Sequence, residues 1–214
     1  VPSMKCRFCD NGEGAIWACF GHLPLRLPDN GRIYELLRPT ILPLDDNIAV
    51  RREIAELLEL DFDLIKPGMT IGLPSLEIYN SDFGDFIHPF PGIIVCRDRP
   101  KTIFEDHGVN GVTFIPVEIK WKLGKSNSNE IPTLWQFYPE GKAWRVGDDV
   151  NNTTICENCG RRVMPQLAHM QIDESRYDGT DVFFVDDFMN RVFVTEKVKN
   201  IVEDNQLSNI VCAP

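Results

Sequence analysis

The sequence CENCGR at residues 156–161 holds two cysteines that are separated by two residues. This spacing lets a tight turn direct both sulfurs towards one point. The sequence CRFC at residues 6–9 is the only other pair of cysteines with the same spacing. Four thiolates are one of the ligand sets that tetrahedral zinc takes in a closed structural site. The two pairs therefore predict one metal site that joins the N-terminus to the C-terminal third of the chain.

The predicted ligands of a structural zinc ion are Cys6, Cys9, Cys156 and Cys159. Zinc ribbons usually separate their two pairs by about 15 to 20 residues, whereas here most of the chain lies between them. His169 is the alternative ligand if one of the first two cysteines does not take part. The same spacing also occurs in thioredoxin-like redox sites, so a redox role for the thiols stays open.

Composition indicates an ordinary globular protein, because 43% of the 214 residues are hydrophobic and 25% are charged. We expect residues 1–214 to form a single domain. No uninterrupted apolar stretch approaches the ~20 residues that span a bilayer, and the N-terminus lacks the apolar run of a secretory signal. We therefore expect a cytoplasmic protein. An odd number of cysteines, seven, argues against a fully paired disulfide framework.

The formal net charge of −10 bears on the choice of partner. Nucleic acids and anionic membrane surfaces would repel such a chain, so we expect it to bind neither. A basic protein would be attracted. The plainer alternative is that the acidic surface only keeps the protein soluble.

The hydrophobic pattern predicts an α+β fold with a mainly antiparallel sheet and a few flanking helices. The clearest amphipathic helix runs from Asp46 to Leu60, with Asp45 or Asp46 as its N-cap. Two further helices are expected, one from Pro100 to Gly108 and one after Thr195. Strands are expected at residues 16–20, 93–97, 113–122, 134–138, 143–146, 181–185, 191–194 and 209–212. The expected strands at 134–138 and 143–146 form a hairpin, whereas residues 69–91 form a long irregular loop.

Enzyme signatures are missing from the sequence. It contains no glycine-rich phosphate loop, no HExxH and no GxSxG. Its four histidines are scattered, and each is more readily explained as a surface or core residue than as a catalyst. We therefore expect no catalytic residues and no enzymatic activity.

A set of short features recurs in order along most of the chain. They are the pair at 6–9, Arg38-Pro39, Pro67-Gly68, Gly84-Asp85-Phe86, the expected strand that ends at Arg97, the pair at 156–161, Asp181-Val182-Phe183 and Thr195-Glu196. In these features the chain resembles the double-CxxCG family of bacterial proteins, some of which are immunity proteins that neutralise a toxin delivered between neighbouring cells. The first pair departs from the family, because it has Asp10 where the family has glycine.

This resemblance implies a single immunity-protein-like domain that binds a toxin domain, and the acidic charge suits a basic toxin that acts on nucleic acid. The expected mechanism is steric and electrostatic blockage of the toxin's active site, with zinc as a purely structural ion. The rival hypotheses are a zinc-dependent or thiol redox enzyme and a zinc-ribbon adaptor protein.

Acidic loops are the surface on which we expect the toxin to bind, because loops present functional groups on a rigid scaffold. The stretch DFGDF at residues 82–86 places acids between aromatic residues. Such a stretch suits either a loop that is pinned to the core or an exposed recognition surface. The predicted contact residues are Asp82, Asp85, Phe86, Asp148 and Asp149.

Overall fold

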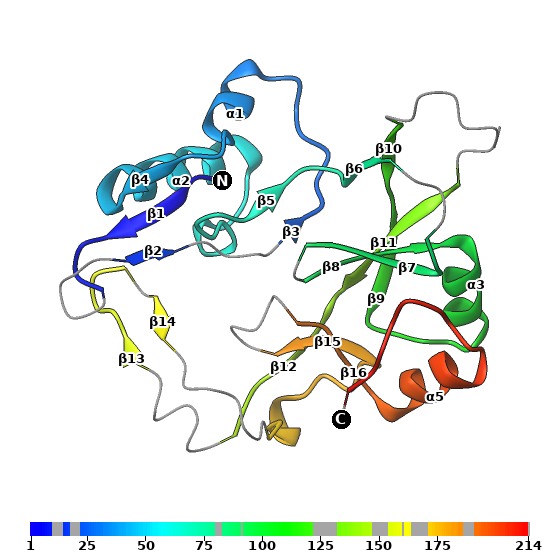
Figure 1. Ribbon diagram of the computed structural model, residues 1–214. Helices are drawn as coiled ribbons and strands as arrows, with labels where there is room; N and C mark the ends of the chain where they lie inside the picture. The colour runs from blue at the N-terminus through cyan, green and yellow to red at the C-terminus, as the bar shows by residue number, and fades with distance from the viewer. Residues whose placement is uncertain are drawn as a thin grey trace. The chain divides into compact units, whose positions relative to one another are not determined.

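The protein has a mixed α+β fold, as the sequence predicts (Figure 1). Of the ten strand pairings among the described residues, six are antiparallel and four are parallel. The computed structural model describes residues 1–9, 15–17, 22–79, 83–90, 92–121, 132–146, 154–159, 161–163, 171–185 and 191–213.

The contacts within the chain divide it into two compact units. The first unit comprises Val1–Gly72 and Arg145–Gln171, and the second comprises Leu73–Trp144 and Ile172–Pro214. Each unit is therefore assembled from two separate stretches of sequence. Whether the two units form the single domain expected for residues 1–214 stays a prediction.

The described residues of the first unit form short strands and two α-helices. Its three-stranded sheet has the order β2-β1-β4, in which β1 runs antiparallel to β2 and parallel to β4. The elements are β1 (Ser3–Cys6), β2 (Ala15–Trp17), β3 (His22–Leu23), α1 (Gly31–Leu36), β4 (Ile41–Pro43), α2 (Leu44–Leu58), the 3-10 helix η2 (Phe62–Leu64), β5 (Thr70–Ile71), β13 (Thr154–Ile155) and β14 (Arg162–Val163).

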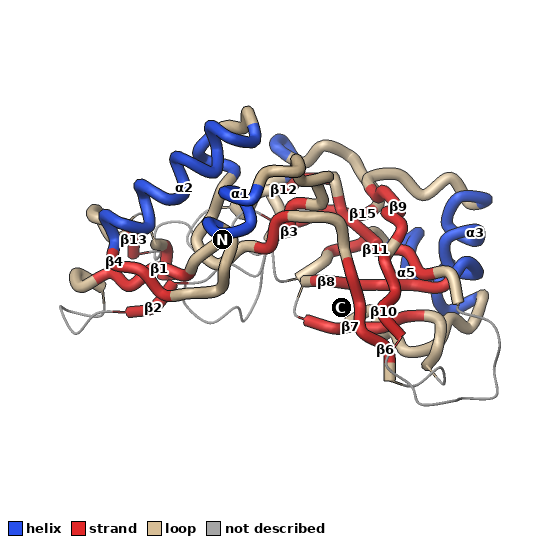
Figure 2. Tube along the Cα trace, turned by 90° about the horizontal axis from the view of Figure 1, so that it is seen from above, coloured by secondary structure: helices blue, strands red, loops and turns tan. Residues whose placement is uncertain are grey.

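Helix α2 is the long amphipathic helix of the sequence analysis, and it packs against β1 and β4 (Figure 2). The helix begins after Pro43, two to three residues earlier than predicted. Asp45 and Asp46 therefore lie in its first turn and do not cap it. Acidic side chains in a first turn are favourable because they oppose the positive end of the helix dipole. Glu59 ends the helix in a left-handed conformation with φ 54°.

The core of the first unit is formed by α1, α2 and the segment from Ile65 to Ile71. Two polar side chains of α2 are buried beside it and hold neighbouring backbone. Asn47 donates to the carbonyl oxygen of Pro2 at 3.0 Å. Arg51 donates through Nε to the carbonyl oxygen of Ile65. These two buried polar side chains thus attach the helix to the backbone at Pro2 and at Ile65.

The second unit is organised around a four-stranded antiparallel sheet of order β7-β8-β11-β9. A two-stranded parallel sheet, β10-β6, and a three-stranded sheet, β12-β15-β16, complete it. Its elements are β6 (Ser75–Ile78), β7 (Phe86–Phe90), β8 (Ile93–Arg97), α3 (Asp98–Asp106), β9 (Val112–Pro116), β10 (Glu118–Trp121), β11 (Leu134–Pro139), β12 (Gly141–Ala143), the 3-10 helix η3 (Glu174–Arg176), β15 (Val182–Val185), β16 (Phe193–Val194) and α5 (Glu196–Asp204).

Aromatic residues dominate the core of the second unit. Phe86, Phe104 and Phe137 are almost fully buried, and the rings of Phe104 and Phe137 lie 5.6 Å apart at 60°. Each buried phenylalanine contributes about 1.5–3 kcal/mol through removal of apolar surface from water. Helices α3 and α5 pack beside each other and bring Phe104 and Val198 into this core (Figure 1).

Several sequence predictions of secondary structure were wrong. The expected irregular loop at residues 69–91 contains β5, β6 and β7, and α1 was not foreseen. The expected hairpin after β11 does not form, because β12 pairs in parallel with β15. A Cβ atom at Gly141 would lie 1.9 Å from Oγ1 of Thr180, so glycine permits this close approach to the chain before β15. In the described part of the chain, no helix is long and apolar enough to cross a membrane.

Candidate metal centre

The second cysteine pair lies at the tip of a short hairpin. Strands β13 and β14 pair antiparallel, with Ile155 opposite Arg162. The backbone N–H of Cys156 donates to the carbonyl oxygen of Arg161 at 2.9 Å, which closes the turn that carries both cysteines. This local pairing holds the two sulfurs of the turn close to each other.

The first cysteine pair also follows a strand of a hairpin. Cys6 is the last residue of β1 and stands opposite Ala15 of β2, and Cys9 lies in the turn that follows. Both side chains are buried, with 0% and 4% of their surfaces exposed. The rest of β1 is held between β2 and β4, so the first pair is anchored to the sheet of the first unit.

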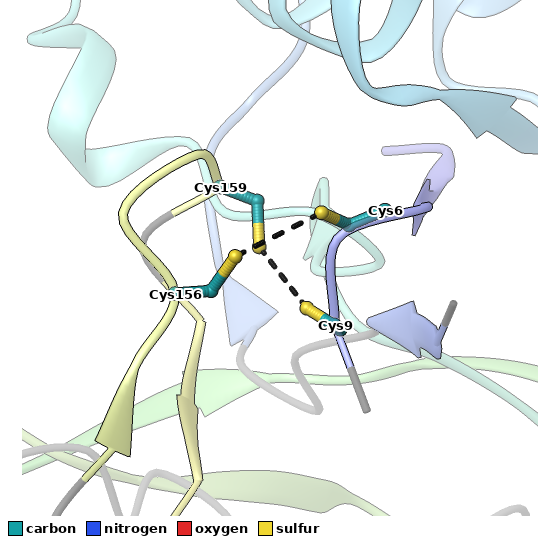
Figure 3. A group of neighbouring side chains, drawn as sticks. All are labelled: Cys6, Cys9, Cys156 and Cys159. Carbon is teal, nitrogen blue, oxygen red and sulfur yellow. Dashed lines mark hydrogen bonds between the residues drawn. The ribbon is translucent and has the colours of Figure 1, made fainter. Parts of the chain in front are cut away.

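The two hairpins bring all four cysteines together although 150 residues separate them in sequence (Figure 3). The sulfurs of Cys6 and Cys156 lie 3.9 Å apart, and those of Cys9 and Cys159 lie 3.5 Å apart. All four sulfurs lie within 4.8 Å of one another. The cluster therefore links the N-terminus to the C-terminal part of the chain, as predicted.

The arrangement of the sulfurs fits a tetrahedral metal ion. With metal–sulfur bonds of about 2.3 Å, the sulfurs of a tetrahedral zinc tetrathiolate lie about 3.8 Å apart. The two measured distances lie on either side of this value. A disulfide would need an S–S distance of about 2.0 Å. Four cysteine ligands would also fill the coordination sphere of the ion, which is the property of a structural site.

Hydrogen bonds prepare one of the four sulfurs for ligation. The backbone N–H groups of Cys159 and Asn158 donate to the sulfur of Cys156 and lower its pKa to about 7. Burial raises the pKa of Cys9 and of Cys159. A bound cation would offset the cost of burying these two as thiolates, because a coordinating thiol loses its proton.

The structure contradicts an exposed contact surface at Asp85 and Phe86. Phe86 is fully buried in the aromatic core of the second unit. Asp85 is 8% exposed, and its carboxylate accepts hydrogen bonds from Arg99 and Ser208. The described residues of this stretch, 83–86, thus match the alternative hypothesis of a loop pinned to the core, because large aromatic side chains are stabilised by burial.

The other predicted contact residues, Asp82, Asp148 and Asp149, lie outside the described residues, as does the alternative ligand His169. The partners of Asp85 were not found by sequence reasoning. Ser208 lies 123 residues away in sequence, and no spacing or motif connects the two.

Comparisons with known proteins do not assign the chain to a family. No protein-family model matches it, and no curated protein has a significantly similar sequence.

Proposed function

We propose that the four cysteines bind one zinc ion with a structural role. The convergence of their sulfurs is the observation that carries this proposal. Zinc matches both the all-sulfur donor set and the tetrahedral geometry. It would hold the β13–β14 hairpin to the β1–β2 hairpin and supply folding free energy to the first unit.

The metal can be tested on the purified protein. We expect about one zinc per chain, because four thiolates complete one coordination sphere. Cys156→Ser should lose the metal and lower the melting temperature. Cys212→Ser is the matched control, because Cys212 is also only partly buried but is not one of the four clustered cysteines. Metal content near zero in the wild type, or full content in Cys156→Ser, would reject the site.

We further propose that the protein is an immunity protein that binds and neutralises a basic toxin domain. Two observations support this. The sequence pattern resembles a family that includes immunity proteins, and the chain carries a net charge of −10. A basic enzyme that acts on nucleic acid would meet a complementary field, which accelerates association at low salt. The zinc in this proposal is part of the scaffold and takes no part in the blockage.

Coexpression with a basic nuclease toxin domain, chosen from the genes beside this one, tests the binding role. We expect the protein to rescue growth and to copurify with the toxin domain. Failure of both, with folded and metal-loaded protein, would reject neutralisation and leave the metal site standing. Toxin turnover measured with and without the protein then tests whether binding blocks the active site.

The contact surface can be tested separately by charge reversal. Asp148→Lys together with Asp149→Lys should slow association and weaken its dependence on salt. The control is Asp106→Lys, which reverses one exposed acid at the end of α3. Equal association rates for both variants would remove this surface from the proposal while leaving neutralisation intact.

A further inference from the structure

The segment that follows α5 crosses to the edge strand of the four-stranded sheet. It is the red end of the chain in Figure 1. Two of its residues, Gln206 and Asn209, have positive φ angles of 49° and 61° and redirect the chain. The sequence predicted an edge strand at residues 209–212, but the structure has no strand there. In the described residues, no backbone–backbone hydrogen bond joins residues 208–213 to β7.

Asp85 holds the start of this segment through both its backbone and its carboxylate. Its backbone N–H donates to the hydroxyl oxygen of Ser208 at 2.9 Å. Oδ2 of Asp85 accepts from the backbone N–H of Ser208 at 2.8 Å and from its hydroxyl at 2.9 Å. The same oxygen accepts from Arg99 at 2.8 Å, and Arg99 also donates to the carbonyl oxygen of Asn205 at 2.6 Å. The end of α5 and the segment after it are thus attached to the residue before β7, Asp85, directly through Ser208 and indirectly through Arg99.

The next residue lies against β7 itself. Nδ2 of Asn209 donates to the carbonyl oxygen of Phe86 at 2.6 Å, and Nε2 of His88 donates to the carbonyl oxygen of Asn209 at 3.1 Å. Strand β7 is the edge of its sheet, and within the described part of the chain no strand pairs with its outer side. Side-chain contacts cover part of an edge that would otherwise be available to another chain.

Some apolar side chains of the segment pack against the core, whereas others face solvent. Leu207 is buried, and Ile210 and Cys212 pack against the core of the second unit. Val211, by contrast, is 90% exposed. The segment is therefore attached at separate points, and its contacts with β7 form no continuous backbone ladder.

We propose that residues 208–213 form a detachable strap, which covers the free edge of β7 and can open while the sheet remains folded. The hydrogen bonds from Ser208 to Asp85 are its latch. Opening breaks the side-chain bonds of Ser208 and Asn209 and withdraws Ile210 and Cys212 from the core, but it leaves the pairing of β7 with β8 intact. It also uncovers the outer edge of β7.

Native-state hydrogen exchange on the intact, metal-loaded protein tests the strap. Amides of residues 208–213 should exchange through a local opening that depends little on denaturant, whereas β11 should exchange through global unfolding. A common denaturant dependence in the strap and in β11 would reject the proposal, because the segment would then open only when the whole unit unfolds.

The latch is tested by Ser208→Ala, which removes the hydroxyl and retains the backbone N–H. Exchange of residues 210–213 should become about tenfold faster, because a hydrogen bond to a charged group is lost. A protease that cleaves beside aliphatic residues should also cut at Ile210 or Val211 more quickly. The matched control is Ser175→Ala, which removes a hydroxyl that donates to Asp173 outside the strap.

Asn209→Gly gives a second variant in case Ser208→Ala does not fold, because glycine adopts the positive φ angle of this position without strain. It removes the donor to Phe86 and leaves the contacts of Asp85 in place. Faster exchange confined to the strap and β7 supports a detachable strap. Unchanged exchange in residues 210–213, or an equal increase throughout the second unit, would overturn it.

Discussion

Two carboxylates of the second unit, Asp85 and Asp181, show how single residues hold distant segments together. Asp181 is 9% exposed and accepts from Lys197 at 2.7 Å, from Thr195 at 3.1 Å and from the backbone N–H of Asn110 at 3.1 Å. These bonds compensate for the loss of water around a buried charge. Each carboxylate thus joins elements that lie far apart in sequence.

These contacts predict a loss of stability in acid. Burial raises the pKa of both carboxyls, but their hydrogen bonds outweigh this effect and hold each pKa below the ordinary value of 3.8. Because the pKa is lower in the folded state, their contribution is complete above the unfolded-state value and is lost as the pH falls through the folded-state values.

Denaturant unfolding at pH 7 and at about pH 3 measures this contribution, since the unfolded-state pKa is about 3.9. Asp181→Asn should cost about 1.5–3 kcal/mol at pH 7 and much less in acid. An equal cost of the substitution at both pH values would contradict the predicted role of the charge.

Gln136 provides a second prediction for a single residue. It lies in the central strand β11, is 2% exposed, and its Oε1 has no hydrogen-bond partner among the described residues. An unpartnered buried polar group costs about 1–3 kcal/mol. We expect Gln136→Met, which keeps the length of the side chain, to raise the free energy of unfolding by about 1 kcal/mol. The control is Gln171→Met at an exposed position, where the change should be close to zero. A clear loss of stability in Gln136→Met would count against this interpretation.

Among the secondary-structure elements, the parallel pairing of β12 with β15 depends on a glycine. Gly141 stands opposite Phe183, and a Cβ atom there would lie 2.4 Å from the carbonyl oxygen of Val182 as well as close to Thr180. The backbones of β12 and β15 cannot move apart to make room for a Cβ atom without loss of their pairing. The sequence PEGK at residues 139–142 is typical of a turn, yet its glycine serves a strand.

Gly141→Ala should therefore destabilise the protein by about 2 kcal/mol or more, because overpacking against backbone typically costs 1–3 kcal/mol. Gly31→Ala is the control for the addition of a methyl group. Gly31 lies in α1 with no atom within 4 Å of the added Cβ, so alanine should be neutral or stabilising by up to about 1 kcal/mol. Thermal unfolding of both variants provides the measurement, and a similar change in both would refute the steric argument.

For the whole molecule, the metal centre should stabilise the two units unequally. All four cysteines belong to the first unit. Removal of the metal with a chelator should raise hydrogen exchange in α2 and leave β11 and α3 nearly unchanged, since metal binding supplies free energy to the structure that contains the site. Equal loss of protection in both units would show that the chain unfolds as one cooperative domain, as the sequence analysis expects.

Local patterns in the sequence determined the fold class, the two cysteine pairs and several elements. The two cysteine pairs identified the cluster because the spacing within each pair carries its geometry. Strand β8 was predicted at its observed bounds, and α5 begins directly after Thr195. The geometry of each pair and of each of these elements depends on residues that are close in sequence, whereas the meeting of the two pairs joins residues 150 apart.

Tertiary structure alone decided the remaining features. Each of these features depends on segments that are distant in sequence. They are the assembly of each unit from two stretches, the parallel pairing of β12 with β15 and the burial of Asp85 beneath Ser208. The residues of the stretch at 82–86 favoured burial but also allowed exposure. In the structure, Phe86 lies in the aromatic core, and Asp85 is held by Ser208 and Arg99. Long-range contacts of this kind leave no periodicity or spacing in the sequence, because any residue of suitable size and polarity can supply either partner.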